Sequence, residues 1–203
     1  MFDSQTIAAL TTMADETEIN PAALLAIAEV ESGGQALFDI SGGKEPAIRF
    51  EGHYFDRRLS GRLRDYARSN GLSAPVAGQI RNPKSQTARW LLLERAMGLS
   101  KKAALESTSW GLGQVMGAHW EWLGYATVDE LVAEARGSVA GQARLMLRFI
   151  EKAELLEVLK VRNWREFARR YNGPAFARNE YDKRMAEAYQ RWQKQLENFK
   201  RAA

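Results

Sequence analysis

The segment NPAALLAIAEVESGG, residues 20–34, constrains the fold more than any other part of the sequence. Asn20 is a favourable N-cap residue and Pro21 suits the first turn of a helix. The pair Gly33-Gly34 is typical of a helix end. Because mostly apolar residues lie between these two signals, we predict a helix of about three turns that packs into a core.

The predicted helix carries two glutamates that differ in their expected surroundings. At about 100° per residue, Glu31 falls on the same stripe as Leu24, Ile27 and Ala28, whereas Glu29 falls on the opposite, polar side. A carboxyl group among apolar neighbours loses hydration, which raises its pKa and makes it a candidate general acid near neutral pH. Alternatively, the helix ends one residue earlier and Glu31 only caps it or forms an ion pair at the surface.

Composition and charge exclude several classes of protein. The 203 residues have a formal net charge of +4 and contain no cysteine, so disulfide frameworks and thiolate sites are excluded. The charge favours an anionic partner, such as nucleic acid, a membrane surface or a cell-wall polymer, but basic and acidic residues alternate along the chain. We expect no signal peptide, because Asp3 stands where a basic region would precede an apolar run.

Helical patterns dominate the rest of the chain and predict a mainly α fold, with residues 1–203 forming a single domain. The expected helices cover residues 4–15, 53–59, 86–97, 127–137, 139–152, 163–171 and 180–200. Within residues 86–97, Trp90 and Leu91 to Leu93 are expected in the core. Residues 61–85 contain three glycines and two prolines, and we expect them to be mostly loop.

Two short apolar runs around the glycine-rich segment SGGKE predict a β-hairpin. Its first strand lies at residues 36–40, and its second, residues 47–51, ends at Glu51. A substrate groove is expected where this hairpin meets the helical body.

Four ordered blocks of the sequence resemble one family. They are VESGG, RFEGHYF, SWGLGQVMGAHWEWLGY and WREFARRYNGPAFARNEYDKRMAEAY, and the resemblance runs from about residue 5 to 192. Together they are similar to the phage-type N-acetylmuramidases (endolysins), within the lysozyme-like superfamily that also includes goose-type lysozymes and lytic transglycosylases. The resemblance implies an α+β lysozyme-like fold, a small hairpin lobe and activity on bacterial peptidoglycan.

The resemblance also implies two catalytic carboxylates. The glutamate of VES corresponds to Glu31, which agrees with the helical wheel, and the glutamate of the FEGH block corresponds to Glu51. Glu31, kept neutral by burial, would donate a proton to the leaving oxygen, while an ionised Glu51 would act on the opposite face of the sugar. Glu45 is a third acid beside the hairpin and an alternative for the second role.

Further residues are expected to border the sugar groove. An amide at Gln114 can bond an N-acetyl group, and Gly113 allows close approach of the main chain, although its alternative role is tight helix packing. Tyr171 and Asn172 of YNGP are expected near the acid, with a core role as the alternative for Tyr171. We expect His53 to support Glu51.

Other chemistries have little support in the sequence. His53 and His119 are too few for a three-histidine zinc site, and no HExxH motif occurs, so we expect no metal and no cofactor. Ser32 is expected to cap its helix, because no histidine–aspartate pair accompanies it. The alternatives that remain are a lytic transglycosylase that uses Glu31 alone and an inactive cell-wall-binding module.

The expected partner is peptidoglycan, with no nucleic acid, and the expected state is a monomer. The C-terminal helix has a basic face that could touch an anionic outer membrane, although a solvated face is the simpler interpretation. Its basic residues are Lys183, Arg184, Arg191, Lys194, Lys200 and Arg201. We expect synthesis in the cytoplasm, followed by release to the wall.

Overall fold

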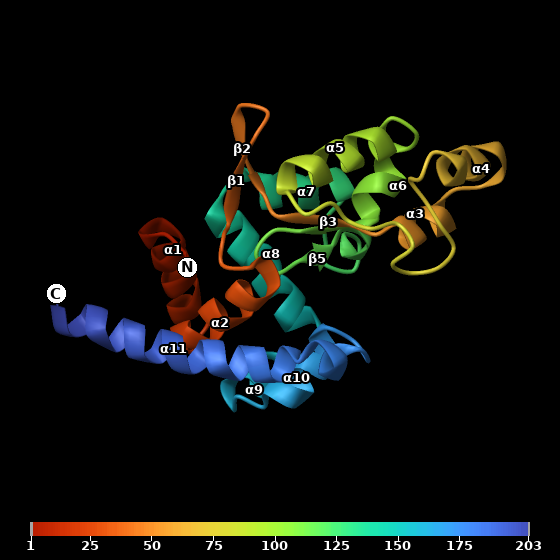
Figure 1. Ribbon diagram of the computed structural model, residues 1–203. Coiled ribbons are helices and arrows are strands. Elements are labelled where there is room, and N and C mark those ends of the chain that lie inside the picture. Colours follow the sequence, from red (N-terminus) through yellow and green to blue (C-terminus); the bar gives the residue numbers. More distant parts are fainter. Residues whose placement is uncertain (1, 203) are drawn as a thin grey trace.

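The computed structural model describes residues 2–202 and shows a helical body with two small antiparallel sheets (Figure 1). The helices are α1 (Ser4–Glu16), α2 (Pro21–Ser32), α3 (Gly52–Arg58), α4 (Gly61–Ser69), α5 (Gln86–Met97), α6 (Lys101–Glu106), α7 (Val128–Gly137), α8 (Val139–Lys152), α9 (Leu156–Lys160), α10 (Trp164–Tyr171) and α11 (Tyr181–Ala202). The strands are β1 (Leu37–Ile40), β2 (Gly43–Pro46), β3 (Ile48–Phe50), β4 (Thr108–Trp110) and β5 (Val115–Met116). A mainly α fold with a small sheet is therefore confirmed.

Helix α2 lies at the centre of the body, against α1 and the long α11 (Figure 1). The Asn20 side chain accepts a hydrogen bond from the Ala22 N–H at 2.9 Å, and Gly33 ends the helix in the left-handed region at φ 73°. Both predicted end signals are thus confirmed. All residues from Ala22 to Ala28 are buried, so α2 is covered on more faces than its apolar stripe indicated.

Glu29 corrects one expectation about this helix. Its carboxylate accepts hydrogen bonds from the indole N–H of Trp192 at 2.7 Å and from Arg191 at 2.6 Å, both on α11. The side chain is only 26% exposed. The face of α2 that the sequence assigns to solvent is therefore the face on which α11 packs.

The buried side chains form two clusters that α8 joins. One cluster contains α2 and the helices around it, including Met146 of α8. The other contains the three-stranded sheet with α3, α5, α6 and α7, and it includes Leu145 of α8. The buried Gln142 of α8 adds polar links, because its amide accepts a hydrogen bond from the Leu112 N–H and donates one to the Ala36 carbonyl.

The hairpin forms, but its second strand differs from the prediction. β1 pairs with β2, with Leu37 opposite Pro46 and Ile40 opposite Gly43. Ser41 and Gly42 between them both have positive φ, as a two-residue hairpin turn with matching twist requires. The predicted second strand, residues 47–51, instead contributes β3 to a separate sheet in the order β3-β4-β5.

The helix predictions are correct for most segments and wrong for three. Residues 61–85 are mostly loop, as predicted, but α4 occupies their first part, and neither α4 nor the short helices α6 and α9 were predicted. Leu91 is 53% exposed and not a core residue, whereas Trp90, Leu92 and Leu93 are buried. Short helices such as these have too few residues to show a helical period.

Candidate active site

Glu31 lies inside the last turn of α2, one residue before the helix ends. The end itself is made by Ser32, whose hydroxyl donates to the Ala28 carbonyl at 2.7 Å and accepts from the Gly34 N–H at 3.3 Å. Ser32 therefore satisfies local backbone groups, as expected for a residue that ends a helix. Glu31 keeps its helical position and is not the cap.

The surroundings of Glu31 favour its neutral form. Burial raises the pKa of Glu31 to about 7 from an ordinary value of 4.5. Two groups lower the pKa of Glu31: the Asn172 amide, which donates a hydrogen bond to Glu31 Oε1 at 2.7 Å, and the positive charge of Arg184. The net result is a carboxyl group that can hold or release a proton near neutral pH.

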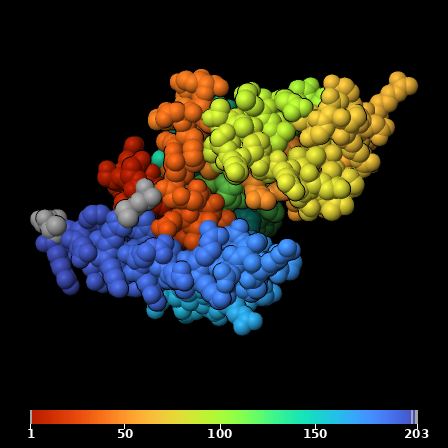
Figure 2. Space-filling view, in the orientation of Figure 1, coloured from red at the N-terminus to blue at the C-terminus, as the bar shows by residue number. Residues whose placement is uncertain are grey.

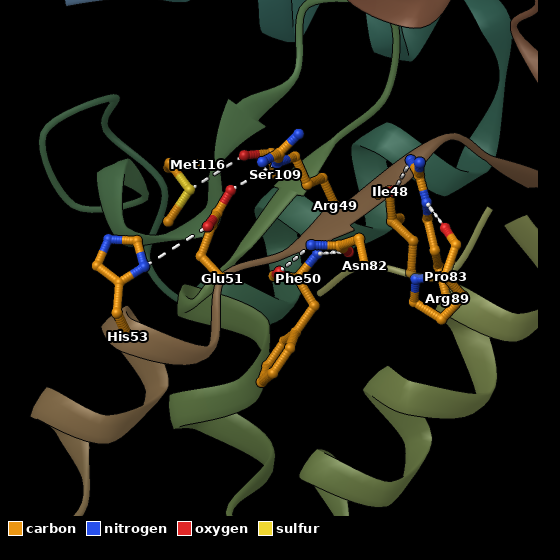
Figure 3. A network of polar contacts seen from close by, with 10 residues as sticks. All are labelled: Ile48, Arg49, Phe50, Glu51, His53, Asn82, Pro83, Arg89, Ser109 and Met116. Carbon is orange, nitrogen blue, oxygen red and sulfur yellow. Dashed lines mark hydrogen bonds and ion pairs between the residues drawn. The ribbon is translucent and has the colours of Figure 1, made fainter. Parts of the chain in front are cut away.

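Glu51 follows β3 directly and stands at the N-cap position of α3. Its Oε1 accepts a hydrogen bond from Nε of Arg49 at 2.7 Å, and its Oε2 lies 3.6 Å from Nδ1 of His53 (Figure 3). The side chain is 20% exposed. Glu51 therefore belongs to the three-stranded sheet, and a guanidinium holds it in place.

The backbone that carries Glu51 is fixed on both edges. On one edge β3 pairs with β4, with Arg49 opposite Ser109. On the other edge the Asn82 amide bonds both the N–H and the carbonyl of Phe50, at 3.0 and 2.7 Å (Figure 3). On the same edge Gln86 Oε1 accepts from the Ile48 N–H. Two side chains thus replace a neighbouring strand and limit the movement of Glu51.

Glu31 and Glu51 line the same cleft of about 570 Å³. Figure 2 shows the surface hollowed between the yellow-green region of α5 and the blue segment that leads into α11. The lining is mostly polar and consists of Val30, Glu31, Ser32, Gly33, Arg49, Glu51, Arg89, Ser109, Gln114, Asn172, Asn179 and Tyr181. Segments far apart in the sequence therefore meet at one groove.

The structure brings only some of the predicted groove residues to this lining. Gln114 and Asn172 are among the lining residues, and the Gln114 amide donates to the carbonyls of Gly111 and Ala47 at 2.9 and 3.3 Å. The Oδ1 of Asn172 is buried and has no hydrogen-bond partner within the described chain.

Gly113, Tyr171 and His53 are not among the residues that line this cleft. The Tyr171 hydroxyl donates to the Gly113 carbonyl at 2.7 Å, and a Cβ at Gly113 would lie 2.6 Å from Cγ of Met146. Both residues therefore pack the loop before β5 against α8 and α10, which is the alternative that the sequence left open for each. His53 lies beside Glu51, as expected.

Glu45 lies outside the cleft. Its carboxylate makes two hydrogen bonds with the Arg136 guanidinium of α7, one of them 2.8 Å long. These contacts are on a different part of the surface, beside Lys44, Lys101 and Asp129. The geometry therefore separates Glu45 from Glu31 and Glu51.

Sequence reasoning missed Arg49, Arg89, Ser109, Asn179 and Tyr181 in the cleft lining. One signal was present: Arg49 and Glu51 are two residues apart, and alternate residues of a strand point to the same face. Arg89 gave no such signal, because it reaches the cleft from α5 through the packing of that helix on β3. Within residues 2–202, no group of three or more His, Asp or Glu side chains could hold a metal ion.

A mainly helical fold with a small sheet, and a cleft that holds a carboxyl of raised pKa together with a second carboxylate, define a lysozyme-like glycoside hydrolase. Comparison with known proteins agrees. The family model for N-acetylmuramidases matches residues 20–193, so the chain belongs to the muramidase family. Its substrate is accordingly peptidoglycan.

A solved structure supports the same assignment. The crystal structure of the endolysin of Burkholderia phage AP3 matches with a TM-score of 0.76 and 34% sequence identity, over 93% of this chain and 71% of that chain. No curated protein matches the sequence. No helix of the described chain is long and apolar enough to cross a membrane.

Proposed function

We propose that the cleft hydrolyses the β-1,4 bond between N-acetylmuramic acid and N-acetylglucosamine, with Glu31 as the general acid and Glu51 as the second carboxylate. The observation that carries this proposal is that both carboxyl groups line one polar cleft and that burial raises the pKa of Glu31 to about 7. A transglycosylase and an inactive binding module are not favoured by the family and structure matches.

The two carboxyl groups have different surroundings, as acid–base catalysis requires. Glu31 lies in the groove with one donor, Asn172, and can be protonated at neutral pH. It gives its proton to the leaving glycosidic oxygen while positive charge grows at the anomeric carbon. The hydrogen bond from Asn172 holds the Glu31 carboxyl in one orientation. Asn172 therefore positions the acid and also lines the groove.

Glu51 has an ionic partner instead. Nε of Arg49 donates to its Oε1 at 2.7 Å and fixes the orientation of the carboxyl group in the cleft. Glu51 then attacks the sugar, orients a water molecule or stabilises the oxocarbenium-like charge. His53, at 3.6 Å from Oε2, supports the other oxygen of the same carboxylate.

The test compares three isosteric variants on purified cell walls. Glu31→Gln and Glu51→Gln are each expected to lower kcat/KM by about two to four orders of magnitude, and the double variant to be scarcely worse, because the two groups act as a unit. Glu45→Gln is the matched control and is expected to keep its activity, because Glu45 pairs with Arg136 outside the cleft. A folded Glu51→Gln enzyme with most of its activity would refute the two-carboxylate mechanism.

We further propose that Gln114 contacts the N-acetyl group of a bound sugar. Its Nε2 is occupied by the carbonyls of Gly111 and Ala47, so its Oε1 is the atom left to accept the N–H of an acetamido group. Gln114→Glu keeps the shape and adds a charge, and it is expected to raise KM more than it lowers kcat. An unchanged KM on soluble glycan fragments would contradict this contact.

The remaining partner proposals concern the C-terminal helix and the oligomeric state. We propose that residues 1–203 act as one monomeric domain without a cofactor and that the end of α11 makes a weak contact with anionic outer membrane. Two basic residues of the helix already form ion pairs, Arg191 with Glu29 and Lys183 with Glu180. Phe199, which lies between Lys194 and Arg201 in the sequence, is 49% exposed. The side chain of Lys200, and residues 1 and 203, lie outside the described residues.

Both parts of this proposal can be measured directly. Light scattering after gel filtration is expected to give the mass of one chain. Lys194→Glu with Arg201→Glu is expected to abolish sedimentation with vesicles rich in anionic lipid, and equal sedimentation of the variant and the wild type would contradict the membrane contact.

A further inference from the structure

The cleft contains a positive charge that the two-carboxylate chemistry does not use. Arg89 of α5 lines the cleft and donates from Nε to the Pro83 carbonyl at 2.9 Å and from one Nη to the Ile48 carbonyl at 3.2 Å (Figure 3). Within residues 2–202 it forms no ion pair with a carboxylate. Its partners are therefore neutral, although its side chain is half-buried.

This arrangement is electrostatically unfavourable in the free protein. Burial, and in addition the nearby charge of Arg49, lower the pKa of Arg89. An arginine stays protonated at neutral pH, so the cost is not relieved by loss of the proton. A half-buried guanidinium beside a second guanidinium, with no carboxylate of its own, is the condition that a bound anion would relieve.

Arg49 completes the arrangement from β3. Its Nε holds Glu51, whereas its two Nη atoms form no hydrogen bond within the described chain. More than half of its side chain is exposed, and it also lines the cleft. Two guanidinium groups therefore offer N–H donors to the same groove, and their planar forks suit a carboxylate.

We propose that Arg49 and Arg89 form a carboxylate-binding subsite that recognises the anionic substituent of the glycan. This inference rests on the proposed function of the cleft. Of the two sugars in peptidoglycan, N-acetylglucosamine is neutral, whereas muramic acid carries a lactyl ether that ends in a free carboxylate or in a peptide with carboxylates of its own. The subsite distinguishes muramyl glycan from chitin, and it selects which sugar lies beside Glu51.

The test measures binding separately from cleavage. In the Glu31→Gln background, calorimetry compares chains with and without Arg89→Gln. The ligands are a muramyl tetrasaccharide with free lactyl carboxylates and the same tetrasaccharide converted to methyl amides. We expect Arg89→Gln to weaken binding of the free acid by about 10-fold and to leave binding of the methyl amide unchanged. Equal effects on both ligands would overturn the proposal, and so would the absence of an effect on every carboxylate-bearing ligand, including the tetrasaccharide with its stem peptides.

Arg95→Gln is the matched control, because Arg95 lies on the same helix, is exposed and bonds only the Asn70 carbonyl. It should leave both affinities unchanged. If Arg89→Gln does not fold, Arg89→Lys keeps the charge and loses the fork, and it should weaken binding of the free acid by about threefold. Unchanged binding by a folded Arg89→Lys chain would overturn the proposal.

A third ligand identifies the source of the carboxylate. When the tetrasaccharide carries its stem peptides, an effect of Arg89→Gln on this ligand alone assigns the subsite to a peptide carboxylate. An effect on the stripped glycan assigns it to the lactyl group, and either result supports carboxylate recognition. Wild-type cleavage is measured independently, so an enzyme that binds selectively but does not cleave would refute the proposed function and leave this inference intact.

Discussion

At Glu31 two opposing effects determine when the site is active. Burial raises the pKa of the carboxyl to about 7, while the Asn172 hydrogen bond and the Arg184 charge oppose that rise. The balance leaves a carboxyl group that is about half protonated at neutral pH. The sequence predicted the burial, because an inward position on a helix can be read from spacing. Asn172 was expected near the acid only through the family resemblance, and Arg184, far away in the chain, could not be placed.

The first prediction at this scale concerns the pH profile. Because the protonated acid is the working form, kcat/KM should fall as pH rises through about 7. Asn172→Ala removes a hydrogen bond that stabilises the ionised carboxyl, so the pKa of Glu31 should rise and the falling limb should move to higher pH. Rates measured from pH 5 to 9 give the position of this limb, and an unmoved limb in the variant would contradict the role of Asn172.

The second prediction concerns stability. Between about pH 4.5 and 7 the native Glu31 keeps a proton that the unfolded chain has lost, so the wild type loses stability as pH rises through that range. Glu31→Gln removes this loss. The variant should be more stable by about 3 kcal/mol at pH 8 and equal to the wild type below pH 4. Urea unfolding measures the difference, and the exposed Glu121→Gln should show none.

At the scale of elements, local sequence signals were sufficient to predict helix starts. They were not sufficient to predict which strands, far apart in the sequence, pair with each other. The caps at Asn20, Thr127 and Asn163 predicted three helix starts, and in each the side chain accepts the expected backbone hydrogen bond. The strand β3 pairs with β4, which lies some sixty residues later, and no local pattern encodes that choice. The strand that leads to Glu51 was therefore predicted, but it was assigned to the wrong sheet.

The third prediction belongs to the contact between α2 and α11. Glu29→Gln keeps the shape but loses the charge that bonds Trp192 and Arg191, so the free energy of unfolding should fall by about 1 to 3 kcal/mol. The kcat on cell walls should stay near that of the wild type, because Glu29 does not line the cleft. Glu31→Gln is expected to have the reverse effects, a loss of activity and a gain in stability. A variant with unchanged stability would show that these hydrogen bonds do not anchor α11.

At the scale of the whole molecule, the cleft is assembled from the end of α2, the three-stranded sheet, α5 and the segment between α10 and α11. The muramidase blocks of the sequence contain most of these segments, which is why the fold was predictable and why Glu31 and Glu51 could be expected in one groove. Arg89 lies outside every block, and its position depends on how α5 packs against β3. The charge of the groove was therefore not predictable.

The fourth prediction concerns the attraction of the cationic chain to an anionic wall. The net charge of +4 and the two cleft arginines predict that activity on purified walls falls when the salt concentration exceeds the physiological value, where the screening length is shorter than about 8 Å. Activity on a neutral, soluble glycan should change little over the same range. Equal salt dependence on both substrates would contradict electrostatic attraction.

The central claim is hydrolysis by two carboxyl groups in one cleft, and the chemical ends of the products test it most directly. Mass analysis of the muropeptides that the wild-type enzyme releases from purified walls distinguishes addition of water from internal attack by a sugar hydroxyl. Hydrolysis at Glu31 and Glu51 predicts reducing N-acetylmuramic acid ends, with almost no product from Glu51→Gln. Anhydro-muramic ends, persisting when Glu51 is replaced, would contradict the account and leave Glu31 working alone.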